Sequence, residues 1–201
     1  MLLTPAWRKF ALTAHVTASV GWLGSVVGFL ALAIIGVRSL DDRAAQSIYP
    51  ALELMATVVI VPFSVAALVT GVIQSFGTSW GLFRHYWVLA KLLITIGASL
   101  LLLLHMQLVQ RAAMAASDGT LAIAPRMQLV GDAVAATGVL AIAVALSVYK
   151  PQGLTPFGSP RDAGGATRQG PFIYLFWAAI VSLLGTLVVR HLFSGGMQSH
   201  F

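Results

Sequence analysis

Seven ionisable residues lie within or at the margins of long apolar runs: His15, Glu53, His85, Lys91, His105, Asp132 and His191. Near the centre of a bilayer such a group costs about 2.5–3.5 kcal/mol, so each one needs a partner or a function. At a rise of about 1.5 Å per helical residue, they fall into two layers, one toward each end of the apolar runs. We therefore expect two candidate sites.

The first layer contains His15 and Lys91, with Arg84 and His85 just outside the run that holds Lys91. This set suits a b-type haem, because the iron takes an axial histidine and the propionates pair with cations. A structural interpretation is also open. His15 can hydrogen-bond Ser19 or nearby backbone, and Lys91 can extend to the lipid headgroups.

The second layer combines Glu53 and Asp132 with a set of candidate metal ligands: His105, His191, Met197 and His200. These ligand types near one depth predict a copper or other metal site. The structural alternative places Glu53 and Asp132 at helix N-termini, where the helix dipole favours anions, and pairs His105 with one of them. No HxxxH or HExxH spacing marks a preformed site.

Several kinds of chemistry are excluded by what the sequence lacks. There is no cysteine, which removes disulfides, thiolate nucleophiles and cysteine-held metals. There is no P-loop, no GxGxxG and no Ser/His/Asp grouping for nucleotide or hydrolase chemistry. The net charge of +6 is spread over the ends of apolar runs without an aromatic-rich basic stretch, so nucleic acid is not a partner. Nothing in the sequence establishes that the protein is an enzyme.

The fold class follows from composition and from the length of the apolar runs. The chain is 58% hydrophobic and 9% charged, with a mean hydropathy of +0.89, too few charges to cover a soluble protein of 201 residues. Crossing a hydrocarbon core of about 30 Å takes roughly 20 apolar residues. Five runs meet this length: 10–37, 52–73, 87–109, 129–149 and 172–189. They predict an all-α, polytopic transmembrane helical bundle of about five spans, in contact with the lipid bilayer.

The segments between the runs divide the chain. Residues 1–150 form a predicted four-helix transmembrane core, 151–171 a Pro/Gly-rich linker, and 172–201 a fifth transmembrane helix with a polar tail. Within the core we expect a polar loop over 38–50 and a kink at Pro62. The Ala-rich stretch 111–126 is expected to extend a helix beyond the membrane.

A small-residue face on the first span predicts helix packing. Gly21, Gly24 and Gly28 allow another helix to approach closely in lipid. The partner helix belongs either to a second copy of the chain or to another membrane protein. A non-catalytic subunit of a membrane complex is therefore an alternative to redox or metal-handling roles.

The orientation follows from the basic residues that flank the spans. One side carries six of them: Arg8, Lys9, Arg84, Lys150, Arg161 and Arg168. The other side carries five: Arg38, Arg43, Arg111, Arg126 and Arg190. The positive-inside rule then predicts a multi-pass protein of the plasma membrane with its N-terminus in the cytoplasm.

Three segments carry a family resemblance: RKFALTAHVTASVGWLG at 8–24, WGLFRHYWVLAKLL at 80–93 and LSVYKPQGLTPFG at 146–158. On these segments the chain resembles an uncharacterised family of actinobacterial integral membrane proteins, a domain of unknown function. The resemblance covers residues 9–158. It implies a membrane protein and implies no activity.

A more distant similarity concerns the pattern H-x6-W-x-G that begins at His15 and the pattern W-x3-K-L that contains Lys91. These patterns resemble the membrane-embedded protoporphyrinogen oxidase family, which binds b-type haem, and the copper-resistance D family. The resemblance to the oxidase family implies functional roles for His15 and Lys91 and, with an offset from Trp87, for Arg84. The chain departs from that family in its added fifth span and in the late position of its third-span histidine.

Overall fold

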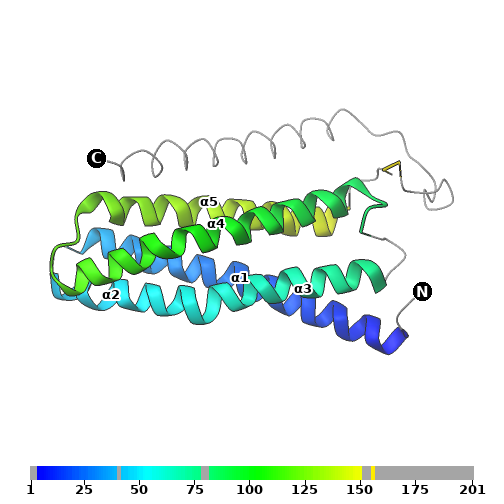
Figure 1. Ribbon diagram of the computed structural model, residues 1–201, viewed down its shortest axis with the longest axis horizontal. Coiled ribbons are helices and arrows are strands. Elements are labelled where there is room, and N and C mark those ends of the chain that lie inside the picture. The colour runs from blue at the N-terminus through cyan, green and yellow to red at the C-terminus, as the bar shows by residue number, and fades with distance from the viewer. Residues whose placement is uncertain (1–3, 40–41, 78–81, 151–154, 157–201) are drawn as a thin grey trace.

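The computed structural model describes residues 4–39, 42–77, 82–150 and 155–156. These residues are helical almost throughout, which confirms the all-α fold class (Figure 1). The elements are α1 (Pro5–Arg38), α2 (Asp42–Met55), the π-helical turn η1 (Ala56–Ile60), α3 (Val61–Gly77), α4 (Tyr86–Ser117) and α5 (Ile123–Tyr149).

Four helical segments of the described chain are long and apolar enough to cross a membrane: Pro5–Arg38, Arg43–Gly77, Tyr86–Ser117 and Ile123–Tyr149. They contain the first four predicted spans. The predicted fifth span, 172–189, lies outside the described residues, as does most of the linker 151–171.

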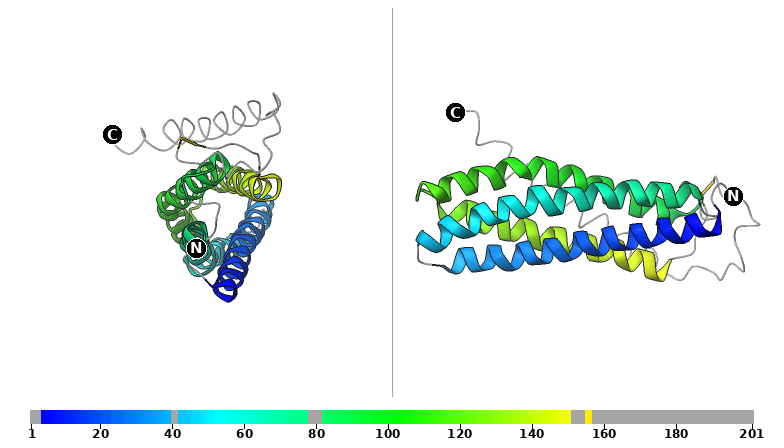
Figure 2. Two further views of the ribbon diagram at one scale, coloured as in Figure 1. Left: turned by 90° about the vertical axis from the view of Figure 1, so that its right-hand side faces the viewer. Right: turned by 90° about the horizontal axis from the view of Figure 1, so that it is seen from below.

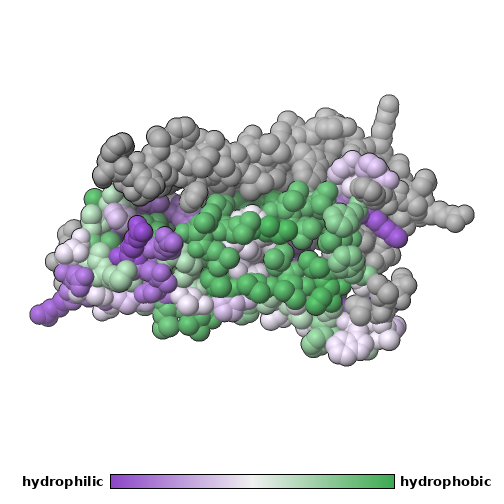
Figure 3. All heavy atoms as spheres, viewed as in Figure 1, coloured by the Kyte–Doolittle hydropathy of each residue, from purple (hydrophilic) through white to green (hydrophobic). Residues whose placement is uncertain are grey.

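The outer surface of the bundle matches this assignment. Large apolar side chains such as Val20, Leu54, Leu93 and Leu104 are exposed on the described helices. Figure 3 shows a broad apolar face along the bundle, with polar residues gathered toward one end. Such a surface is stable against lipid rather than water. The protein is therefore a multi-pass membrane protein in contact with the bilayer.

The second segment begins earlier than the sequence predicts. Most of the predicted loop 38–50 is helical, so this prediction is wrong. The reason is the apolar stripe Ala45, Tyr49 and Leu52, which has helical spacing and is almost completely buried in the core. Its burial outweighs the helix-breaking tendency of Pro50, which lies inside α2.

The irregularity expected at Pro62 is present just before it. The N–H of Val61 bonds to the carbonyl of Ala56, five residues back, which widens this turn into the π-helix η1. Pro62 has no N–H for the carbonyl of Val58, and a π turn is a common way to accommodate such a missing bond in a membrane helix. Helices α2, η1 and α3 therefore form one 35-residue segment, Arg43–Gly77.

The four segments form a four-helix bundle (Figure 2). Both α1 and α4 pack against α2, α3 and α5, whereas α1 and α4 do not pack directly on each other within the described chain. Helices α1 and α4 thus face each other across one diagonal, and α2–α3 faces α5 across the other. Trp22, Phe29, Leu52 and Leu140 are among the residues that fill the core.

The two ends of the bundle differ in what they carry. The end of α1, the start of α2 and the α4–α5 connection lie at one end of the bundle. The start of α1, residues 82–85 and the end of α5 lie at the other, here termed the N-terminal end (Figure 1). The expected helical extension beyond the third span is present, since α4 continues to Ser117 and α5 begins at Ile123. Gly119 makes the sharp turn between them at a φ of 70°, which glycine adopts without strain.

The three glycines predicted to form one packing face are divided. A Cβ at Gly21 would lie 2.8 Å from the ring of Phe63, and a Cβ at Gly28 would lie 2.9 Å from the Met55 methyl group. These two glycines therefore pack against the second segment of the same chain. Gly24 is exposed, with nothing within 4 Å of its Cβ position.

Candidate functional site

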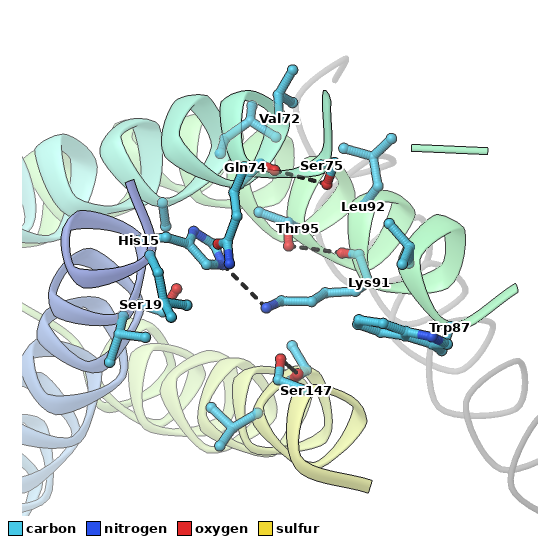
Figure 4. A pocket seen from close by; sticks show the side chains of 18 of the residues that line it. His15, Ser19, Val72, Gln74, Ser75, Trp87, Lys91, Leu92, Thr95 and Ser147 are labelled. Carbon is cyan, nitrogen blue, oxygen red and sulfur yellow. Dashed lines mark hydrogen bonds between the residues drawn. The ribbon is translucent and has the colours of Figure 1, made fainter. Parts of the chain in front are cut away.

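A cavity of about 440 Å³ lies in the N-terminal half of the bundle, with walls from α1, α3, α4 and α5 (Figure 4). Its lining is mainly apolar. The polar side chains on its wall are His15, Ser19, Gln74, Ser75, Lys91, Thr95, Ser147 and Lys150. Its size and lining are those of a small-ligand site, for which about 300–1,000 Å³ is usual.

His15 on α1 and Lys91 on α4 point toward one another across this cavity (Figure 4). The Lys91 Nζ atom lies 3.1 Å from the His15 Nε2 atom. Because α1 and α4 occupy opposite corners of the bundle and do not pack directly on each other, the long Lys91 side chain spans the gap between them. The structure thus joins two residues that are 76 positions apart in the chain.

The hydrogen bonds around His15 determine its tautomer. The Thr70 hydroxyl donates to the Ala66 carbonyl at 2.5 Å, so its oxygen accepts a hydrogen bond from His15 Nδ1 at 3.2 Å. Nδ1 therefore carries the ring hydrogen, and Nε2 keeps a lone pair that accepts from the Lys91 ammonium. The bonds run in one direction, from Lys91 through His15 and Thr70 to the backbone of α3.

The side-chain partners of His15 and Lys91 differ from those that the structural interpretation of the sequence proposed. His15 bonds Thr70 rather than Ser19, and Lys91 is directed into the cavity rather than to the headgroups. Threonine is common in apolar helices, so nothing in the sequence marks Thr70 as the hydrogen-bond acceptor of His15. The role arises because α3 packs against α1 at the level of His15.

Gly71 provides the space for the His15 ring. A Cβ at this position would lie 3.0 Å from His15 Cε1 and 3.4 Å from Nδ1. Contacts this short are rare in proteins, so any larger residue must move the ring or the helix. No local pattern in the sequence marks Gly71, since its role depends on which helix lies opposite.

Arg84 and His85, the other residues predicted for a haem, lie in the turn before α4. His85 is buried and caps α4, and its carbonyl accepts two N–H groups of the first turn at 3.2 Å. The Arg84 carbonyl accepts from the Thr155 N–H at 3.0 Å. Neither residue lines the cavity, whereas Lys150 at the end of α5 does.

In the second predicted layer, His105 pairs with Asp132, with 3.2 Å between Nε2 and Oδ2. His105 Nδ1 donates to the Leu101 carbonyl at 2.7 Å, because a carbonyl only accepts. The pair links α4 to α5, as the structural alternative for His105 predicts.

The proposed helix-terminal positions of Glu53 and Asp132 are wrong. Glu53 lies near the end of α2 and Asp132 lies in the third turn of α5, because both helices begin before the predicted spans. Within the described ranges no group of three or more histidines and carboxylates is placed to hold a metal ion. The other predicted ligands, His191, Met197 and His200, lie outside these ranges.

Comparisons of the chain with protein-family models, with curated proteins and with solved structures find no match. The geometry of the cavity and the chemistry of its residues are therefore what bear on function.

Proposed function

We propose that this protein binds a b-type haem in the cavity at the N-terminal end of the bundle and takes part in redox chemistry in the membrane. His15 serves as the iron ligand, and Lys91 serves as a cationic partner for a propionate. One observation carries the proposal. The His15 Nε2 and Lys91 Nζ atoms meet at 3.1 Å inside a mainly apolar cavity of about 440 Å³.

The surroundings of His15 suit a residue that would bind the iron of a haem. Its Nδ1–H is held by Thr70, which orients the ring and leaves the Nε2 lone pair directed into the cavity. Metal-binding histidines have this arrangement, in which the second ring nitrogen donates to a fixed acceptor. The ring is also buried, which limits the access of competing water.

Lys91 brings a positive charge into the apolar wall. A charge at this depth is costly unless an opposite charge accompanies it. In the part of the chain that the structure describes, no carboxylate pairs with Lys91. A carboxylate on the ligand supplies the missing negative charge.

The residues present fit a b-type haem. The apolar wall, which includes Trp22 and Trp87, suits the faces of a macrocycle, and the histidine and lysine suit its iron and a propionate. A bound b-type haem supplies one-electron chemistry at its iron. The H-x6-W-x-G pattern that begins at His15 and the W-x3-K-L pattern that contains Lys91 resemble those of a haem-binding membrane family, which supports the same assignment.

We also propose that the protein lies in the plasma membrane with its N-terminus in the cytoplasm. The support is the excess of basic residues on that side, six against five on the other. The haem cavity then lies on the cytoplasmic side of the bilayer. An electron donor from the cytoplasm has the shorter path to it.

The test is the absorption spectrum of the purified full-length protein, first oxidised in air and then reduced with dithionite. We expect a Soret band that shifts on reduction and is lost in His15→Ala. His105→Ala is the matched control, because this histidine lies in a helix of the same bundle but outside the cavity, and we expect it to keep the band. A spectrum without a Soret band, even after reconstitution with haem, overturns the proposal.

A further inference from the structure

Building on the haem site proposed above, we propose that Lys91 blocks His15 from coordinating a metal until the ligand arrives. We call this arrangement the latch. The Lys91 ammonium group occupies the Nε2 lone pair until an anionic group of the ligand draws the ammonium away. The ligand must therefore carry both a metal centre for His15 and an anion for Lys91.

The contact itself shows why the two roles of His15 exclude each other. Because Nδ1 carries the ring hydrogen, Nε2 is the ring nitrogen that can coordinate a metal. The same lone pair accepts the hydrogen bond from Lys91 Nζ at 3.1 Å. Nε2 cannot accept this bond and coordinate iron at the same time, so Lys91 has to leave first.

An anion is the group that can take Lys91 away. A hydrogen bond from an ammonium to a carboxylate is stronger than one to a neutral acceptor such as imidazole. The described wall of the cavity has no carboxylate, and its charged or titratable side chains are His15, Lys91 and Lys150. The flexible four-carbon stem of lysine lets the ammonium move while its backbone stays in α4.

The latch makes anion binding and metal coordination one coupled event. A ligand that has a metal but no anion must break the Lys91–His15 bond and leave the ammonium without that acceptor. A ligand with a carboxylate replaces the lost bond with a stronger one. The cavity should thus prefer an anionic metal-bearing ligand over its neutral form by roughly tenfold or more.

The first experiment compares haem b with haem dimethyl ester, in which both propionates are neutral, by titration into purified full-length protein. We expect the wild type to bind haem b at least about tenfold more tightly than the ester. In Lys91→Met, which retains a long apolar side chain but no donor, the ester should bind more tightly than it does to the wild type. Lys9→Met is the control, because Lys9 is exposed and outside the cavity. An unchanged ester affinity in Lys91→Met overturns the latch while leaving the haem proposal intact.

The second experiment needs no haem. Diethylpyrocarbonate modifies imidazole nitrogens with a free lone pair, and mass spectrometry of the peptide around His15 measures the rate. We expect modification to be roughly tenfold or more faster in Lys91→Met than in the wild type or in Lys9→Met. If the wild type binds no haem but this acceleration is seen, the haem proposal fails and the latch stands. Equal rates in all three proteins overturn the latch.

Discussion

At the scale of single residues, the position of the His15 ring depends on Gly71, which has no side chain. We predict that Gly71→Ala displaces the ring from Thr70, because the added Cβ would lie 3.0 Å from Cε1. Haem affinity should fall by roughly tenfold or more, the usual cost when a metal-binding histidine loses the acceptor that holds its other ring nitrogen. Gly97→Ala is the control, since its Cβ position has nothing within 4 Å. Equal affinities of the two variants in a haem titration would contradict this prediction.

Another residue carries a polar group that the described structure leaves without a partner. The Tyr49 hydroxyl is buried, 3.0 Å from the Cβ position of Gly36, and has no hydrogen-bond partner among the described residues. Burying such a group costs about 1–3 kcal/mol. We predict that Tyr49→Phe stabilises the protein by about 1 kcal/mol, a rise of roughly 2–4 °C in Tm in detergent. A lower Tm would show that the hydroxyl has a partner in the membrane.

At the scale of helices, long basic side chains reach across the bundle at both ends. At the N-terminal end Lys91 extends from α4 to α1. At the opposite end Arg126 extends from α5 to the ring of Tyr49 on α2, with 5.7 Å from its Cζ atom to the ring centroid. These two pairs of helices are diagonal and do not otherwise pack together in the described chain. The side chains therefore join corners that the backbones leave apart.

The glycines of α1 face different surroundings, because Gly21 packs against Phe63 inside the bundle and Gly24 faces outward. A pair of variants can test this difference. We predict that Gly21→Leu destabilises the bundle by about 1–3 kcal/mol, because the side chain would overlap the ring of Phe63. Gly24→Leu should change stability by no more than about 0.5 kcal/mol, because Gly24 is exposed. Thermal unfolding of both variants in detergent measures the difference.

The outward position of Gly24 also bears on the predicted association with another helix. If a partner packs on this face, Gly24→Leu should weaken the association without destabilising the bundle. Size-exclusion chromatography in detergent measures the size of the complex, and so detects a loss of association independently of unfolding. Equal destabilisation by Gly21→Leu and Gly24→Leu would contradict the assignment of Gly21 to the inside of the bundle and of Gly24 to its outer surface.

At the scale of the whole molecule, the absence of cysteine makes the orientation directly measurable. We predict that Thr120→Cys, in the α4–α5 loop, reacts with a membrane-impermeant maleimide in intact cells. Phe83→Cys, at the N-terminal end, should react only after lysis. The expected pattern follows from the proposed orientation, in which the N-terminus lies in the cytoplasm. The reverse pattern would place the cavity that contains His15 and Lys91 on the outer side.

The sequence by itself determined the features that depend on local composition. The first four spans were predictable because each holds about 20 apolar residues, whatever its neighbours. The two polar layers were predictable for the same reason, since depth in a helix follows from residue number. The early start of α2 was missed because Pro50 and the charges near residue 42 are local signals of a loop, whereas the burial of Tyr49 and Leu52 that overrides them is tertiary.

Only the tertiary structure decided which residues meet. It placed His15 opposite Lys91 across the diagonal, gave Thr70 and Gly71 their roles, and paired His105 with Asp132. It also directed Gly21 and Gly28 inward and Gly24 outward. These outcomes depend on which helices are neighbours and on how each is rotated about its axis. The packing of side chains far apart in the chain sets both, so no local pattern can reveal them.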